Sequence, residues 1–567
     1  MRYTLAFALA ISLVLFLTAC TQTKPPVQDS EKLTQDFIYG TLALSPVSAT
    51  AAGYHQHNGT RLDELLDDYS AAGIDQQRRF CSDIQNRAAA LNAAKLDKEQ
   101  KADLDIINSN TGLCLLELNT IQNFKHNPTV YVELVGNALF TPYMLNYAPL
   151  EQRFDHITRR LEKVPALFEQ AKANLTDAPE VWNRVAREEN DGNIALIDKT
   201  LRAAVPESRK AAYTAAADKA ILATRDFNAF LKDQLSAKTS DWRLGKEKYA
   251  QKFALVLASG LTPEQLLAAA EADLKTVRAE MAKLSAPQTV EQALDAAARQ
   301  HPTRANFIPK AKEMLAQATA FVKQKDLLTL PSRSNLEVTE TPEFLRGIYG
   351  VGGFNPAPPL EPQLGAFYWI TPIPASWSAA RAESKLREYN DYGLQELTIH
   401  EAMPGHYVQF EYANDVQPVS RRLLRTLFSN TPYVEGWGVY AQQLMSDAGY
   451  LDNSKGLRLT FDKQILRVLA NTILDVRLQT MGMTDQQALD LMTKDTFQEK
   501  EEATAKLQRA QLSSCQLPTY FVGWKGWLDV RAHYQQRKGA AYSLKEFHQA
   551  ALKESGVSLP ALDGLLN

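Results

Sequence analysis

Residues 400–406 read His-Glu-Ala-Met-Pro-Gly-His, and this heptapeptide constrains the local backbone more than any other stretch of the chain. On an ideal helix, two residues six apart are separated by 600°. The second imidazole would then lie about 120° off the face of the first and about 9 Å further along the axis. Pro404 removes the amide that would bond to the carbonyl of His400, so a helix has to bend or bulge here. Gly405 can adopt the backbone dihedral angles that such a bend requires. We expect the bend to bring His406 back toward His400.

These residue types predict a metal site. Neutral imidazoles bind divalent metals, and a neighbouring carboxylate that is not a ligand, here Glu401, can take a proton from the attacking water. The common zinc signature places its histidines four residues apart on one helical face, whereas here a bend in the helix would have to bring the two imidazoles to the same side. The alternative interpretation is a structural pair of histidines.

Glu435 is the candidate third ligand. It follows His406 by 29 residues, near the start of a helix expected from Tyr433 onward. Zinc sites with two histidines and one glutamate take their third ligand from such a neighbouring helix. The alternative is a carboxylate that only stabilises the positive end of its own helix.

The first twenty residues predict an export signal. Arg2 precedes an apolar run, Leu5 to Leu17, which ends in Leu-Thr-Ala-Cys at Cys20. This ending resembles the lipobox of bacterial lipoproteins, which implies a signal peptide at 1–19, a lipid on Cys20 and a tether at 20–35. Thr21 in place of aspartate resembles outer-membrane lipoproteins of Gram-negative bacteria. A transmembrane anchor is less favoured because the apolar run is short, and no later stretch could span a bilayer.

Three further cysteines and the charge balance limit the remaining functions. In an oxidising compartment Cys81 and Cys114 are the local candidates for a disulfide, which leaves Cys515 free.

Charged residues make up 22% of the chain and the formal net charge is −3. Because there is no basic cluster with interleaved aromatic residues, we expect no nucleic-acid partner.

Apolar residues at three- and four-residue spacing predict a mostly α-helical fold. Capping boxes begin at Thr262 and Thr484. The expected helices in the first half are 96–118, 150–175, 181–235 with a split at Pro206, and 265–283.

Composition changes at Leu327, after which the chain is rich in proline, glycine and aromatic residues as far as Ser378. We expect a small sheet there, just before the metal-binding helix, with a surface loop as the alternative. A helix from 379 to about 412, interrupted at Pro404, and a helix at 421–428 follow. The mature domain, 36–567, would then consist of an N-terminal helical part (36–326) and a metal-site part (327–567).

Two motifs together resemble a known family. His400 to His406 matches H-E-x-x-P-G-H, and Glu435-Gly-Trp-Gly-Val-Tyr440 matches E-G-W-x-x-Y. Both are typical of the bacterial domain-of-unknown-function family numbered 885, whose members are often lipoproteins. That family is similar to the gluzincin metallopeptidases, such as carboxypeptidase Taq. The resemblance implies two helical lobes around a deep cleft, with Zn²⁺ held by His400, His406 and Glu435 and with Glu401 as general base.

The oxyanion-stabilising residue is left open at this point. Many family members have a tyrosine where this chain has Trp524, and Tyr520 lies one helical turn before it. Tyr520 is therefore the first candidate, and His533 and Arg477 are alternatives.

Taken together, the sequence predicts a membrane-tethered zinc-dependent peptidase of the cell envelope that acts on peptide substrates. The alternatives are a zinc hydrolase of a non-peptide amide and a non-catalytic, metal-containing binding lipoprotein. An intact Glu401 argues against the binding protein, because a structural metal site does not need that carboxylate.

Overall fold

The computed structural model describes residues 26–342, 345–346 and 350–567. Helices account for 72% of the chain and strands for 3%, which confirms the mostly helical class. The predicted signal peptide and Cys20 lie outside the described residues. Part of the predicted tether is wrong, because residues 26–35 form the first turns of helix α1 (Pro26–Leu44). Leu33 and Phe37 on that helix are buried in the core, so packing holds the segment in place.

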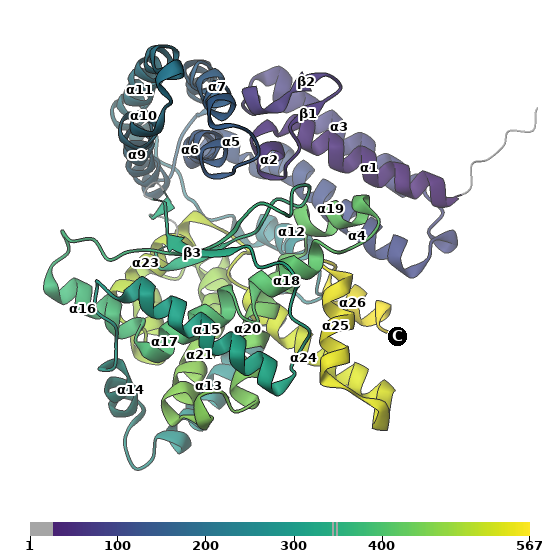
Figure 1. The fold of residues 1–567 in the computed structure, drawn as a ribbon, viewed down its shortest axis with the longest axis vertical. Coiled ribbons are helices and arrows are strands. Elements are labelled where there is room, and N and C mark those ends of the chain that lie inside the picture. Colours follow the sequence, from purple (N-terminus) through teal and green to yellow (C-terminus); the bar gives the residue numbers. More distant parts are fainter. Residues whose placement is uncertain (1–25, 343–344, 347–349) are drawn as a thin grey trace, which may run out of the picture.

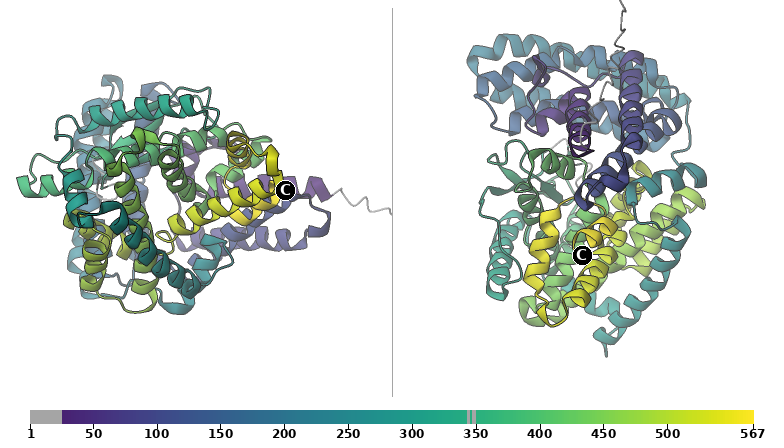
Figure 2. Two further views of the ribbon diagram at one scale, coloured as in Figure 1. Left: turned by 90° about the horizontal axis from the view of Figure 1, so that it is seen from below. Right: turned by 90° about the vertical axis from the view of Figure 1, so that its right-hand side faces the viewer.

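The first part of the chain forms a group of helices drawn in purple and blue in Figures 1 and 2. Its main helices after α1 are α2 (Pro46–Ala51), α3 (Ala71–Ala90), α4 (Lys98–Leu116), α6 (Thr129–Met144), α7 (Leu150–Leu161), α8 (Val164–Asn174), α9 (Glu180–Ala195) and α11 (Lys210–Asp233). A short hairpin, β1 (Gln56–His57) and β2 (Thr60–Arg61), precedes α3. The helix expected at 150–175 is broken between α7 and α8, where Pro165 occupies the first turn of α8. The predicted split near Pro206 is present.

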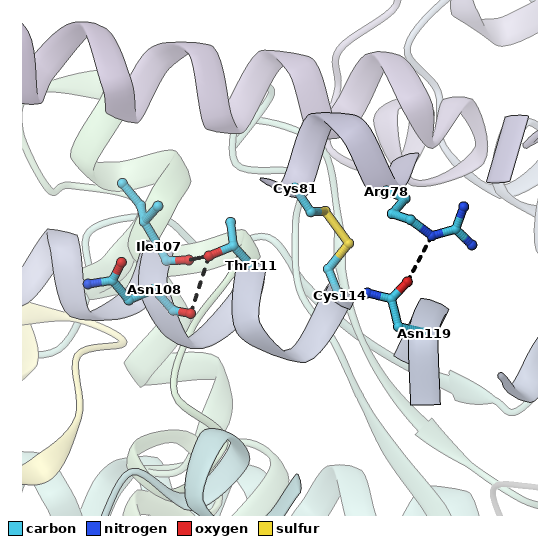
Figure 3. The surroundings of a disulfide bond; sticks show 7 residues. All are labelled: Arg78, Cys81, Ile107, Asn108, Thr111, Cys114 and Asn119. Carbon is cyan, nitrogen blue, oxygen red and sulfur yellow. Dashed lines mark hydrogen bonds between the residues drawn. A yellow bond between two sulfur atoms is a disulfide. The ribbon is translucent and has the colours of Figure 1, made fainter. Parts of the chain in front are cut away.

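A disulfide joins α3 and α4, the two helices of an antiparallel hairpin (Figure 3). Cys81 and Cys114 have Cα atoms 6.5 Å apart, which confirms the predicted pairing. Cys515 is free and buried.

The expected small sheet is also present. Its strand order is β3 (Leu336–Glu340), β5 (Ala366–Ile370), β4 (Gly352–Asn355), with β3 parallel and β4 antiparallel to the central β5. Buried Tyr368 of β5 and Thr398 of helix α17 (Asp391–Glu401) share a hydrogen bond of 3.2 Å. The sheet therefore packs directly against the helix that ends in His400 and Glu401.

A second group of helices contains α17. Its other members are α12 (Gly245–Leu257), α13 (Pro263–Ser285), α14 (Val290–Ala298), α15 (Phe307–Lys325), α16 (Ala379–Glu388), α18 (His406–Ala413), α19 (Val419–Leu427), α20 (Thr431–Asp447), α21 (Lys455–Thr480), α22 (Asp485–Asp490), α23 (Lys500–Leu512), α24 (Thr519–Lys538), α25 (Leu544–Glu554) and α26 (Leu559–Leu565). Within this group α17 contacts α15, α18, α20 and α21. Both predicted capping boxes, at Thr262 and Thr484, are formed.

The helix expected to run from 379 to Pro404 is wrong in one respect, because it breaks at Tyr389. The side chain of Asn390 accepts hydrogen bonds from the amides of Tyr392 and Gly393 and starts α17 as a new helix.

The core is continuous between the two groups. Phe37 of α1 packs against Phe428 at the end of α19, with ring centroids 4.6 Å apart. Arg425 of α19 is 1% exposed and pairs with Glu99 and Asp103 of α4 at 2.6 and 2.7 Å. None of the helices in the described ranges combines the length and apolarity needed to cross a membrane.

Candidate metal centre

The heptapeptide bends as its sequence predicts. α17 ends at Glu401 and α18 begins at His406, and the Met403–Pro404 peptide bond between them is cis. The amide of Gly405 donates to the carbonyl of Ile399 at 3.0 Å. A Cβ on Gly405 would lie 1.9 Å from the carbonyl oxygen of His400, so only glycine fits this close approach.

Trp437 of α20 holds the bend from the other side. Its indole Nε1 donates to the carbonyls of Pro404 at 3.0 Å and Gly405 at 3.1 Å. The bend brings the rings of His400 and His406 to a centroid distance of 4.7 Å, nearly perpendicular to each other. The tryptophan of the E-G-W motif therefore has a structural role that sequence reasoning did not assign.

Glu435, in the second turn of α20, completes the predicted triad. Its Oε2 lies 3.5 Å from Nε2 of His400 and 3.6 Å from Nε2 of His406. One ligand atom from each of the three residues lies within 4.8 Å of the other two. Burial opposes ionisation of Glu435, but its hydrogen bonds with the two imidazoles outweigh that and hold its pKa below the usual range.

The donor set and spacing fit a tetrahedral zinc ion. Bonds of 2.0–2.1 Å at tetrahedral angles put neighbouring ligand atoms about 3.3 Å apart. The separations of 3.5 and 3.6 Å at Glu435 are close to that value. No other group of this kind is found among the described residues.

Gly438, one turn after Glu435, makes room for the imidazole of His400. A Cβ at this position would lie 2.4 to 2.7 Å from three ring atoms of His400. The second glycine of E-G-W-G therefore lets α20 approach the imidazole closely enough for Glu435 and His400 to converge.

Gly436 and Gly523 allow α20 and α24 to cross closely. A Cβ on Gly436 would lie 2.4 Å from Cα of Gly523. Tyr520, one turn before Gly523, thereby lies beside the triad, with its ring centroid 6.3 Å from that of His400. Burial, and next the charge of Glu435, raises the pKa of Tyr520 to about 12, so the phenol keeps its proton at neutral pH.

The two alternatives to Tyr520 are paired elsewhere. Exposed His533 lies 2.9 Å from Asp563, and Arg477 pairs with Glu271 at 2.5 Å. Tyr520 is the one of the three with a ring contact to a triad residue.

Glu401 lies beside the triad without joining it. Burial works to lower the pKa of His406, but the hydrogen bond with Glu435 and then the nearby Glu401 raise it overall. Burial raises the pKa of Tyr368, and the nearby Glu401 adds to that rise. Within the described residues no hydrogen bond or ion pair engages the Glu401 carboxylate.

Sequence reasoning missed two cations on α23. Arg509 donates through Nη2 to Oε1 of Gln516 at 3.1 Å and to the hydroxyl of Tyr520 at 3.4 Å. Lys506, one turn earlier, is 5% exposed. No motif marks these residues, and only the spacing of charges along α23 could have drawn attention to them.

Comparison with known proteins gave a family match and structural relatives. The family described as "Bacterial protein of unknown function (DUF885)" matches residues 46–566. A "putative lipoprotein of unknown function" from Shewanella oneidensis has 28% sequence identity and a TM-score of 0.77, covering 94% of this chain and 99% of that chain. A "putative lipoprotein" from Colwellia psychrerythraea has 18% identity and a TM-score of 0.79, covering 96% and 98%. No curated protein matched. The family resemblance expected from the two motifs is confirmed.

Proposed function

The chain belongs to the DUF885 family of bacterial proteins of unknown function, and we propose from its own site that it is a zinc-dependent peptidase. The observation that carries the proposal is the convergence of His400, His406 and Glu435 beside a carboxylate, Glu401, that has no partner in the described residues. A structural metal site would need the first three residues but not the fourth.

The side chains have separate roles in this proposal. His400, His406 and Glu435 would hold Zn²⁺, which when bound lowers the pKa of a water molecule and polarises a carbonyl group. Glu401 takes the proton of the attacking water and returns it to the leaving amine. The protonated hydroxyl of Tyr520 donates a hydrogen bond to the carbonyl oxygen as negative charge develops on it.

The architecture we propose is gluzincin-like, with the site between two helical lobes. The support is the ligand set drawn from α17, α18 and α20, together with a sheet packed against α17. Such a sheet could align an extended peptide beside the metal by strand addition.

We further propose that the mature protein is anchored in the cell envelope by a lipid on Cys20, facing the periplasm from the outer membrane. The support is the apolar run that ends in Leu-Thr-Ala-Cys, and the two structural relatives described as putative lipoproteins.

The test is hydrolysis of a mixed-peptide library by the purified protein with zinc, read by mass spectrometry. Wild type should cleave peptides, and a chelator or His400→Ala should abolish cleavage together with bound zinc. If wild type retains zinc and binds peptides without cleaving any, the protein is a metal-containing binding protein.

A further inference from the structure

His406 is hydrogen-bonded to a buried glutamine on its own helix. Gln409 follows it by three residues on α18, and the side chain is 3% exposed. Nδ1 of His406 lies 3.3 Å from Oε1 of Gln409. Residues three apart on a helix are neighbours on its surface, so α18 itself brings the two side chains together. The other ring nitrogen, Nε2, is the atom that lies 3.6 Å from the carboxylate of Glu435.

A backbone carbonyl fixes which way the amide of Gln409 points. Nε2 of Gln409 donates to the carbonyl oxygen of Tyr433 on α20 at 3.3 Å. A carbonyl oxygen can only accept a hydrogen bond, so the amide nitrogen of Gln409 has to face Tyr433. If the amide were turned over, two acceptor oxygens would face each other. Oε1 is therefore the atom that Gln409 presents to His406.

The amide of Gln409 in turn fixes the tautomer of His406. Its Oε1 can only accept, so the hydrogen of this bond is carried by Nδ1 of the imidazole. A neutral imidazole has a single N–H, which leaves Nε2 with its lone pair. That lone pair lies on the side of Glu435 and His400, where the three candidate ligands converge.

The carbonyl of Tyr433 is held by a third helix. Nε1 of Trp527, on α24, donates to the same oxygen at 2.9 Å. The rings of Trp527 and Tyr433 are both buried and pack with centroids 5.0 Å apart. The orientation of His406 therefore depends on α20 and α24 as well as on its own helix.

We propose that Gln409 is a positioning residue of the metal centre, which holds His406 in the tautomer that directs Nε2 at the metal ion. This rests on the function proposed above and adds a residue that acts through a ligand. Partners of this kind fix the tautomer and the ring orientation of a ligating histidine, and losing one weakens metal binding about 10- to 100-fold. An uncharged amide does so without adding a further negative charge beside Glu435 and Glu401.

The first experiment measures the zinc affinity of the purified full-length protein by competition with a chromophoric chelator. Gln409→Met keeps the length of the side chain but removes the acceptor, and should weaken zinc binding about 10- to 100-fold. Gln409→Glu keeps an acceptor for Nδ1 and should stay within about tenfold of wild type. If Gln409→Met does not fold, Gln409→Asn takes its place, because the shorter amide cannot reach both of its partners.

Gln442→Met is the matched control. Gln442 is buried on α20, and its Nε2 donates to the carbonyl of Glu396 on α17 at 3.2 Å. This variant loses the same kind of bond to a backbone carbonyl, but that bond does not involve a candidate ligand. It should keep wild-type zinc affinity. Because Trp527 still donates to the carbonyl of Tyr433, metal-free Gln409→Met should melt at about the same temperature as metal-free Gln442→Met.

A second measurement reports the geometry of the site. Co²⁺ can replace Zn²⁺, and the visible absorption spectrum of bound Co²⁺ depends on how its ligands are arranged. Gln409→Met should change this spectrum, because the imidazole of His406 is then free to turn. Gln409→Glu should restore it, and Gln442→Met should leave it unchanged.

The outcomes separate the two proposals. Equal zinc affinity in wild type and Gln409→Met, or an equal loss in Gln442→Met, would overturn the positioning role while leaving the proposed peptidase intact. Binding by Gln409→Glu as weak as that by Gln409→Met would show that the acceptor is not what matters, and would also overturn it. If wild type binds no zinc, the proposed function fails and the role of Gln409 fails with it.

Discussion

Replacing Gly438 with alanine should disrupt the proposed zinc site without unfolding the protein. The added Cβ would lie 2.4 Å from Cε1, 2.6 Å from Nδ1 and 2.7 Å from Nε2 of His400. Carbon contacts settle near 3.5 Å, so the imidazole has to move by about 1 Å. Zinc sites tolerate deviations of about 0.2 Å, so His400 would be lost as a ligand. Disturbing a residue that only supports a ligand weakens metal affinity about 10- to 100-fold, and here we expect at least the upper value.

The same substitution should leave the metal-free fold intact. Gly438 lies inside α20, where alanine favours the helix by about 1 kcal/mol over glycine. The atoms in its way belong to a side chain that can rotate aside when no metal holds it. Gly436→Ala is the matched contrast, because its Cβ would meet the backbone of Gly523 at 2.2 Å. That contact can be relieved only by separating α20 from α24, so this variant should melt at a lower temperature.

Two measurements are needed. Competition against a chromophoric chelator gives the zinc affinity, and thermal denaturation with and without chelator gives the stability of each form. Gly438→Ala should melt like metal-free wild type, or slightly above it, in both conditions. Wild-type zinc affinity in Gly438→Ala would refute the placement of His400 against α20.

Four further outcomes are expected. Glu401→Gln should keep zinc, as metal analysis would show, and lose turnover by about 10⁴-fold, because the general base is removed; a loss of zinc would mean that Glu401 is a ligand. Tyr520→Phe should lower kcat by about 10²- to 10³-fold with little change in KM, and an unchanged kcat would exclude it as the oxyanion donor. Cys20→Ser should release the protein from the membrane fraction or block its processing, so unchanged fractionation and processing would argue against the lipid. Burial lowers the pKa of His548 to about 4, so between pH 6.5 and about 4 a proton binds this imidazole in the unfolded chain but not in the folded one. The free energy of unfolding should therefore fall by up to about 3 kcal/mol as the pH drops over that interval. Urea denaturation of His548→Gln at several pH values should show a smaller decrease, because the variant lacks this group.

Local patterns predicted much of this fold. Capping boxes at Thr262 and Thr484 depend on residues three apart, and both form as expected. The bend at Pro404 and Gly405 could be predicted from the sequence, because proline lacks a backbone amide hydrogen and glycine lacks a side chain. The convergence of His400, His406 and Glu435 could be predicted because their residue types and spacing are rare together.

Other features depend on contacts that the sequence does not display. The sequence does not show whether a glycine such as Gly438 allows a turn or makes room for a neighbouring side chain, because that depends on what packs against it. Lys506 reads as an ordinary surface lysine until α23 is seen to pack its charged face inward. The break before Asn390 is not predicted either, because it depends on the side chain of Asn390 capping α17. The helical start of α1 is not predicted because it depends on the burial of Leu33 in the core.

The disulfide between α3 and α4 makes the stability of the native chain depend on where it folds. It joins residues 33 apart, and closing a loop of that size restricts the unfolded chain by about 3.7 kcal/mol in the entropic account. α4 also supplies Glu99 and Asp103 to the buried guanidinium of Arg425. In a reducing compartment the folded chain should therefore be less stable by about that amount, and the ion pairs between α4 and Arg425 would have to hold α4 in place without the covalent bond.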